Sequence, residues 1–292
     1  MIRTGFMERN LRWVFPLPAV VFVVVLMLFP VVYTVFLSFT NWNLTSGMPL
    51  SFVGLKSYAR VFSEPRFLAA IGRTFSFTGM ALALETFFGV ALALVLNREF
   101  RGKGPIKLFL LLPLVATPVA VGIVFNLFYD PTIGLANWML SLAGIPKIEW
   151  VSNTATVLPA LVLVDVWQWT PMIALICLAG LASLPSDPYE SARVDGATAP
   201  QILWRITLPM LAPTILTAMI LRSVDALKTF DIIFAMTGGG PGYSSETLNI
   251  LGFKYSFDYF KMGQSSVMLV TLFTIVLAAS LVIMKLRDKV EA

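Results

Sequence analysis

Six long apolar runs divide this 292-residue chain, with shorter polar segments between them. Each run is at least as long as the roughly 18 apolar residues that cross the hydrocarbon core of a bilayer as a helix. The runs do not alternate between polar and apolar positions over about 10 residues, as the strands of a membrane barrel do. The pattern therefore predicts an all-α integral membrane protein with six transmembrane helices in a single domain, residues 1–292. The predicted spans are about 13–39, 74–96, 106–128, 157–181, 206–227 and 264–285.

The polar segments between the spans give an orientation. Six spans place both termini on one side, and with that side in the cytoplasm the inner segments hold twelve Lys and Arg against eight outside. This modest excess follows the positive-inside rule, and the cluster Asn97–Lys107 contributes most to it. The outer segment 40–73 weakens the pattern and is predicted to form short amphipathic helices at the outer surface. We therefore expect a multi-pass protein with both termini in the cytoplasm.

Composition removes several classes of function. The chain is 58% apolar and 13% charged, whereas soluble domains average about 25% charged residues. It has no His, and its single Cys177 lies in an apolar run, so neither a disulfide nor a Cys–His metal cluster is expected. We predict no catalytic residue and no metal site. The net charge of +5 fits basic residues at membrane helix ends better than nucleic-acid binding. The first apolar run is too long for a signal peptide and is predicted to be a retained span.

A polar segment, 182–209, separates the fourth and fifth runs and has the signals of two short helices around a glycine. Asp187 is the expected cap of the first helix, with Pro188 at its first position and Glu190 three residues after the cap. Gly196 is expected to end that helix in a left-handed conformation. The second helix is expected to begin at Pro200 and to be interrupted at Pro209.

A helix of barely two turns is marginal in water, so the first of these two helices must dock on something. One possibility is an amphipathic loop resting on the lipid surface, and the other is a rigid projection that fits a partner protein. The segment carries three acidic side chains beside Arg193 and Arg205. Anionic lipid attracts basic helices, so this balance disfavours lipid.

The same segment resembles the EAA loop of permease subunits from binding-protein-dependent ABC importers. Glu190-Ser191-Ala192 is followed after three residues by Gly196, and after nine more by Ile206-Thr207-Leu208-Pro209. Every spacing of the family pattern is matched, and the one departure is Ser191 in place of an alanine.

The resemblance implies the type I ABC importer permease fold, with a cytoplasmic coupling helix that sits in a cleft of an ATPase subunit. The implied coupling residues are Glu190, Ser191, Ala192, Arg193, Asp195, Gly196, Ile206, Leu208 and Pro209. The implied partners are an ATPase subunit dimer, a second and different permease subunit, an extracytoplasmic sugar-binding protein and membrane lipid. This chain has no GxxxxGK[ST] phosphate loop. It is therefore expected to bind no cofactor, with ATP and Mg on the partner ATPase, in a prokaryotic plasma membrane.

A second motif concerns the cargo. The run Thr237-Gly238-Gly239-Gly240-Pro241, followed by Glu246-Thr247-Leu248, resembles sugar permeases of the larger maltose permease subunit family. The alternative interpretation is a flexible glycine turn. The likeness extends over most of the chain, although the maltose subunit has extra N-terminal spans and a large outer domain that are missing here.

Polar residues within the predicted spans mark either a cavity or structural pairs, because such groups are costly in lipid. Arg222 and Asp225 lie three apart on one predicted helix and are expected to pair, while Glu85 is expected to pair with another span or lie near the surface. Asp165 opens the run DVWQWTPM, in which Trp167 and Trp169 suit either sugar stacking or an aromatic belt at the interface.

Ungapped counting from the EAA loop places several residues on positions that contact sugar in the maltose subunit. The implied substrate-path residues are Asp165, Trp169, Met172, Asp225, Ala226 and Thr229, with Leu114 and Pro118 near further positions. Glycerol phosphate or a related polyol is an alternative cargo, and amino acids or peptides are disfavoured by the glycine-rich motif. A different class, the ion-coupled secondary transporter, would use Glu85, Asp165 and Asp225 for protons or sodium; such carriers commonly have more spans and internal repeats.

Overall fold

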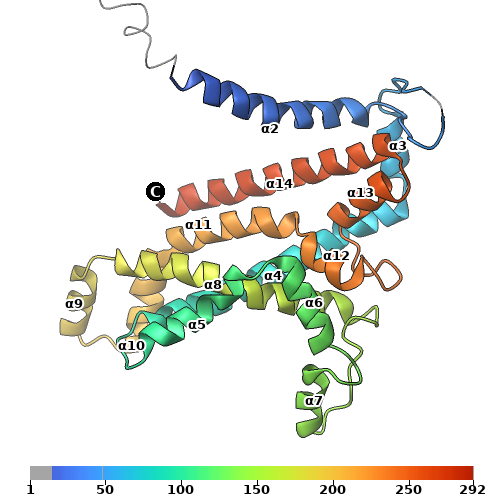
Figure 1. Cartoon of the computed structure of the whole chain (residues 1–292). Coiled ribbons are helices and arrows are strands. Elements are labelled where there is room, and N and C mark those ends of the chain that lie inside the picture. The colour runs from blue at the N-terminus through green and yellow to red at the C-terminus, as the bar shows by residue number, and fades with distance from the viewer. Residues whose placement is uncertain (1–14, 48, 292) are drawn as a thin grey trace, which may run out of the picture. The chain divides into compact units, whose positions relative to one another are not determined.

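The computed structural model describes residues 15–47 and 49–291 and is helical almost throughout (Figure 1). Within these residues the only β pairing is an isolated antiparallel bridge between Thr40 and Phe52. The predicted start of the first span at Trp13 lies outside the described residues. The all-α prediction is confirmed, because five helices, or six when a bent pair counts as one, are long and apolar enough to cross a membrane.

Five long helices correspond to five of the predicted spans. They are α2 (Leu17–Ser38), α4 (Pro65–Leu96), α8 (Val157–Ala182), α11 (Leu208–Leu227) and α14 (Met262–Glu291). The largest difference is at α4, which begins at Pro65 and so absorbs the end of the outer segment. The remainder of that segment forms one short helix, α3 (Lys56–Phe62), where several had been predicted.

The run predicted as one span over 106–128 is instead two helices, α5 (Lys103–Val115) and α6 (Pro118–Phe128), bent by 101°. Ala116 and Thr117 are extended between them, with ψ of 137° and 141°. A residue that precedes proline disfavours the α region, and Thr117 precedes Pro118. Pro118 then starts α6 at a position where its missing N–H is not needed.

The polar segment 182–209 forms two short helices, as predicted, namely α9 (Asp187–Val194) and α10 (Ala199–Ile202). Gly196 has a φ of +76°, which confirms its left-handed role. The predicted cap is wrong by one residue, because Ser186 holds the N-cap position and Asp187 is the first helical residue. Pro200 lies in the first turn of α10, as expected.

The chain continues from α10 through a π-helical turn, η1 (Leu203–Thr207), directly into α11. The N–H of Leu208 donates to the carbonyl of Leu203, five residues earlier. Pro209 therefore stands in the first turn of α11 and does not interrupt α10. The other short helices are α7 (Leu135–Leu142), α12 (Asp231–Thr237) and α13 (Leu248–Phe257).

The chain divides into two compact units, one of residues up to 65 with 252–271, and one of residues 66–251 with 272–292. In the second unit, α8 packs against α5, α6 and α11, and α6 packs against α12. Its core contains fully buried Phe77, Leu161, Val164 and Ile233. In the first unit, α13 and α14 are joined by the hydroxyls of Ser256 and Ser265, 2.6 Å apart.

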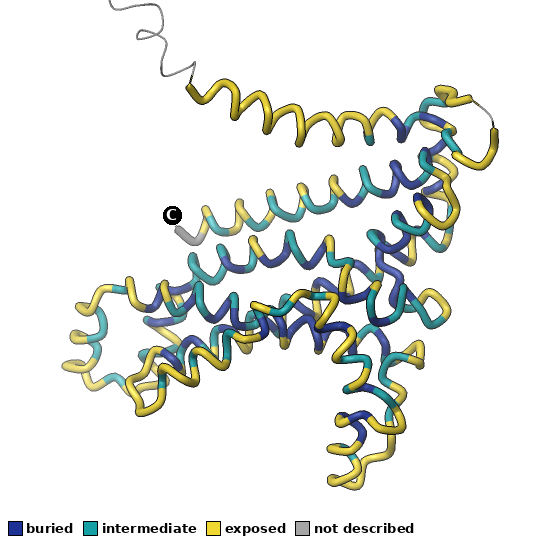
Figure 2. Tube along the Cα trace, viewed as in Figure 1, coloured by how far each residue is buried: buried dark blue, intermediate teal, exposed yellow. Residues whose placement is uncertain are grey.

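Exposure follows the apolar character expected in lipid. Figure 2 shows α2 exposed along almost its whole length, whereas most of α8 is buried. Gly89 permits the close approach of α4 to α8, because a Cβ there would lie 2.8 Å from the side chain of Ile173. Gly180 does the same for α8 and α11, where a Cβ would meet Thr214 at 2.7 Å.

Candidate functional site

Three spans of the second unit contribute charged side chains to one buried cluster. Arg222 on α11 donates from Nε to Glu85 on α4 at 2.7 Å and from Nη2 to the other Glu85 oxygen at 3.0 Å. The same Nη2 donates to Asp165 on α8. All three side chains are at most 1% exposed. Buried charges in a membrane need partners, and here one guanidinium serves two carboxylates.

The predicted pairing of Arg222 with Asp225 is therefore wrong. Asp225 instead forms an ion pair with Lys228 at 3.0 Å, and both side chains are about half exposed. Glu85 was expected either to pair with another span or to lie near the surface, and the structure confirms the first of these, because it pairs with Arg222 on α11. Asp165, expected to differ from the structural pairs, is part of the same cluster.

A cavity of about 380 Å³ lies beside this cluster, in the second unit. Of the predicted substrate-path residues, it is lined by Pro118, Asp165, Trp169, Asp225 and Thr229. Met172, Ala226 and Leu114 do not line it. The structure thus brings together five positions from α6, α8, α11 and the segment that follows α11.

Two features give the cavity polar chemistry. Asp165 lines the cavity from α8, where one of its carboxylate oxygens is held by Arg222. The Arg222 guanidinium lies over the ring of Trp169, 5.2 Å from its centroid. A lining that combines an indole with polar side chains such as Asp225 and Thr229 suits a ligand that has both hydroxyl groups and C–H surface. Trp167 does not line this cavity and packs against Phe125, with ring centroids 5.2 Å apart.

Sequence reasoning missed three polar or charged lining residues, Arg222 among them. Lys228 and Asp231 also line the cavity. The signal was present in the stretch Asp225–Asp231, where three charges follow an apolar run closely.

The polar segment 182–209 forms part of the wall of a larger hollow. In Figure 1, α9 and α10 lie together at one end of α8. A cavity of about 1040 Å³ there is lined by Glu190 and Arg193, together with Arg98 from the end of α4 and Trp204 from the π turn. Most of the predicted coupling residues are exposed: Glu190, Ser191, Arg193, Asp195, Gly196 and Pro209. Ala192, Ile206 and Leu208 are half-buried.

Two large apolar side chains of this segment were not singled out from the sequence. Val194 is 88% exposed and Trp204 is 70% exposed. Their exposure beside the polar face of α9 marks a surface that a partner can cover.

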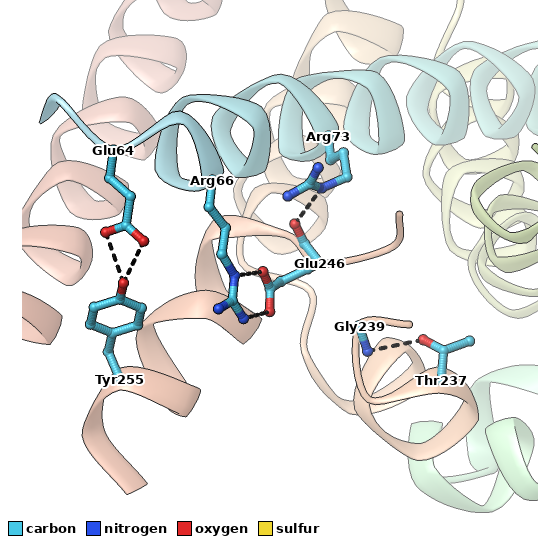
Figure 3. A network of polar contacts seen from close by, with 7 residues as sticks. All are labelled: Glu64, Arg66, Arg73, Thr237, Gly239, Glu246 and Tyr255. Carbon is cyan, nitrogen blue, oxygen red and sulfur yellow. Dashed lines mark hydrogen bonds and ion pairs between the residues drawn. The ribbon is translucent and has the colours of Figure 1, made fainter. Parts of the chain in front are cut away.

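The glycine-rich motif is anchored by its own glutamate (Figure 3). Glu246 is fully buried and accepts two hydrogen bonds from Arg66, both at 2.7 Å. Its backbone carbonyl accepts a third from Arg73 Nε, also at 2.7 Å. Within the turn, Thr237 Oγ1 accepts the N–H of Gly239 at 3.2 Å and is 2.8 Å from Ser245 Oγ. The motif is thus an ordered loop fixed to the start of α4. The first unit has a separate contact in the same view, where Tyr255 donates to Glu64 at 2.6 Å.

Comparison with known proteins agrees with this architecture. The model of the family described as binding-protein-dependent transport system inner membrane component matches residues 85–288. The chain belongs to this family. The matched range begins at Glu85 of the buried cluster and includes the polar segment 182–209, the residues that line the cavity and the glycine-rich loop.

Relatives of this inner membrane component align over almost their full length. The trehalose/maltose transport system permease protein MalF of Thermococcus litoralis is 35% identical over 96% of this chain and 94% of its own. The sulfoquinovosyl glycerol transport system permease protein SmoG of Agrobacterium fabrum is 33% identical, covering 96% and 91%. The trehalose transport system permease protein SugA of Mycobacterium tuberculosis is 31% identical, covering 97% and 91%.

Solved structures show the permease fold. A chain of a bacterial ABC transporter that imports alginate superposes with a TM-score of 0.83 and 21% identity, covering 97% of each chain. A chain of the MetNI methionine ABC transporter superposes with a TM-score of 0.56 and 16% identity. The fold is therefore that of a type I ABC importer permease, and the chain is a multi-span inner membrane component of that class.

Proposed function

We propose that this chain is the transmembrane permease subunit of an ATP-driven sugar ABC importer and forms half of the translocation path. The observation that supports it most directly is the cavity of about 380 Å³ between spans, which is lined by Trp169 together with charged and hydroxyl side chains. Relatives named for trehalose, maltose and sulfoquinovosyl glycerol support a carbohydrate cargo.

The charges of the cavity favour a neutral sugar over a phosphate ester. Three acidic residues line it, Asp165, Asp225 and Asp231, against two basic residues, Arg222 and Lys228. This excess repels an anionic cargo such as glycerol phosphate, the other candidate. The ion-coupled alternative is disfavoured, because the family is one of binding-protein-dependent transport.

The proposal includes the partners that the EAA resemblance implies. The exposed face of α9, with Glu190 and Ser191, docks together with the following turn at Gly196 on an ATPase subunit dimer, on which ATP and Mg are bound. A second, different permease subunit completes the path, and an extracytoplasmic binding protein delivers the sugar. Both termini then lie in the cytoplasm of a prokaryote. The alginate importer solved with its sugar-bound periplasmic protein offers a structural precedent for that delivery.

The test is reconstitution of the chain with the permease and ATPase subunits encoded beside it. ATP hydrolysis is measured with and without the sugar-loaded binding protein, and stimulation by one loaded protein is the expected result. Hydrolysis unaffected by any loaded binding protein, with uptake that instead follows a proton or sodium gradient, contradicts the proposal.

Two tryptophan variants test the cavity itself. Trp169→Leu removes the lining ring, and we expect sugar uptake to fall about fivefold to tenfold, because an aromatic contact contributes about 1–1.5 kcal/mol. Trp167→Leu removes the neighbouring indole outside the cavity and is the matched control. Equal loss in both variants would assign the tryptophans to packing.

A further inference from the structure

A second polar cavity, of about 270 Å³, lies in the first compact unit. Its walls come from the segment after α2, from α3 and from the start of α14. It shares no residue with the cavity beside Arg222. Most of its lining side chains carry a nitrogen that can donate a hydrogen bond, namely those of Asn41, Trp42, Asn43, Arg60, Lys261 and Gln264.

Backbone hydrogen bonds hold these walls in place. The N–H of Gly263 donates to the carbonyl of Trp42 at 2.9 Å, and the N–H of Leu44 donates to Phe260 at 3.0 Å. Ser57 Oγ donates to the carbonyl of Thr40 at 2.9 Å. The strand-like segment at 40–44 is therefore fixed against both α3 and the start of α14, and the cavity is preformed.

The asparagine acceptors of the cavity are already occupied. Asn41 Oδ1 accepts the N–H of Ser51 at 3.0 Å, and Asn43 Oδ1 accepts both the N–H and the hydroxyl of Thr45, at 3.0 and 2.8 Å. Because a backbone N–H only donates, these contacts fix each amide with its oxygen engaged. The Nδ2 groups of both asparagines remain as donors.

The remaining polar groups are also mainly donors. Trp42 Nε1, the Arg60 guanidinium and the Lys261 ammonium form no hydrogen bond or ion pair with any described residue, although Lys261 lies 5.6 Å from the Tyr255 ring centroid. No acidic residue lines the cavity, and the Gln264 amide supplies its one free side-chain carbonyl. Such a set binds an oxygen-rich anion, since it offers many donors and two positive charges.

The position of the cavity at the end of α2 indicates that the anion comes from a lipid headgroup. The cavity begins two residues after the end of α2, an apolar helix with almost every side chain exposed. In a bilayer the polar end of such a helix lies at the level of the lipid headgroups, where tryptophan is enriched. Lys and Arg side chains close to a membrane surface are attracted to anionic headgroups.

We propose that this cavity binds the phosphate group of an anionic phospholipid, with Arg60 and Lys261 as its charged contacts. Zwitterionic lipid binds more weakly, because its trimethylammonium group meets two cations and few acceptors. The proposal is independent of the sugar cavity, so either can fail without the other.

The test uses the assembled transporter in a neutral detergent. Native mass spectrometry measures binding of short-chain phosphatidylglycerol, of phosphatidylcholine with the same chains, and of inorganic phosphate. The double variant Arg60→Gln, Lys261→Gln is compared with Lys56→Gln, Lys147→Gln, which removes two charges from exposed positions outside the cavity. Circular dichroism confirms that both variants are folded.

We expect the cavity variant to bind phosphatidylglycerol about tenfold more weakly than wild type, and the control to bind as wild type does. Competition by inorganic phosphate at similar concentrations would identify free phosphate as a sufficient ligand, whereas no competition would identify the lipid as the source. Equal binding by both double variants, or equal affinity of wild type for the two lipids, would overturn the proposal.

Discussion

Arg222 of α11 holds the carboxylate of Glu85 on α4 through two hydrogen bonds, at 2.7 and 3.0 Å, and the same guanidinium contacts Asp165 on α8. One cation thus joins three spans. Because Arg222 and Asp165 also line the cavity, the joint and the proposed sugar site share two side chains. Stability and cargo binding are therefore linked at this point.

Removal of the cation is expected to destabilise the fold strongly. Arg222→Met leaves two carboxylates buried without a positive partner, which costs about 3–5 kcal/mol. The measurement is thermal unfolding of the assembled complex in detergent. Arg222→Lys is the control, because it keeps the charge while losing the two-pronged geometry, and it should lose less. Equal loss in the two variants would mean that charge does not matter here.

The close approach of α4 and α8 depends on Gly89. Gly89→Ala places a Cβ 2.8 Å from the Ile173 side chain and 3.2 Å from the backbone nitrogen of Ala174, so one helix must shift. We expect a loss of about 1–3 kcal/mol in the free energy of unfolding.

The control lies on the same helix. At Gly79 a Cβ meets nothing within 4 Å, so Gly79→Ala should be neutral or stabilise by up to about 1 kcal/mol. Thermal unfolding of both variants decides the matter, and a Gly89 variant as stable as the Gly79 variant would show that the helices can separate freely.

The glycine-rich loop should loosen when its anchor loses charge. Glu246→Gln keeps the shape of the side chain but removes the negative charge that faces Arg66, which is 19% exposed. We expect a loss of roughly 2 kcal/mol, which is less than the about 3–5 kcal/mol of a fully buried pair because Arg66 retains some water. Hydrogen exchange over residues 238–247 should rise several-fold. Glu149→Gln, at an exposed position, is the control, and unchanged exchange in the Glu246 variant would contradict the anchoring role.

Gly196 is required by its backbone conformation and not by a close contact. Its φ is +76°, and a Cβ there would meet no atom within 4 Å. Gly196→Val should therefore deform the α9–α10 turn, since a β-branched residue is a strong outlier at positive φ. Stimulation of ATP hydrolysis by the loaded binding protein is expected to be lost in this variant.

Gly196→Asn tests whether the left-handed backbone conformation or the absence of a side chain matters at this position. Asparagine visits the left-handed region at little cost, so this variant should keep most of the stimulation. Gly104→Ala, at the start of α5 with no atom within 4 Å of its Cβ, is a second control. A Gly196→Val complex that responds normally would show that the shape of the turn is not transmitted to the ATPase.

The sequence predicted most of the spans because apolar length alone decides whether a helix can cross a bilayer. It missed the 101° bend before Pro118, since a proline in an apolar run is compatible with either a kinked helix or a broken one. Packing of α6 against α12 and α8 selects the broken form.

The partner of Arg222 was beyond sequence reasoning for a different reason. Local spacing offered only Asp225, three residues away, whereas the true partners lie 137 and 57 residues away. Glu246 is similar, because its partner Arg66 is 180 residues away. In contrast, the turn at Gly196 was predicted correctly, because its signals are all within a few residues.

The unbroken helical path from α10 through the π turn into α11 has a mechanical consequence. Residues Ala199–Leu227 form 29 consecutive helical residues, a rod about 43 Å long at 1.5 Å per residue. If such a rod tilts by about 5° around its loop end, its other end moves by nearly 4 Å, which is more than the length of a hydrogen bond. Its far end carries Arg222 and Asp225, so in the proposed importer a tilt imposed at the loop end would displace two cavity-lining side chains by more than a hydrogen-bond length.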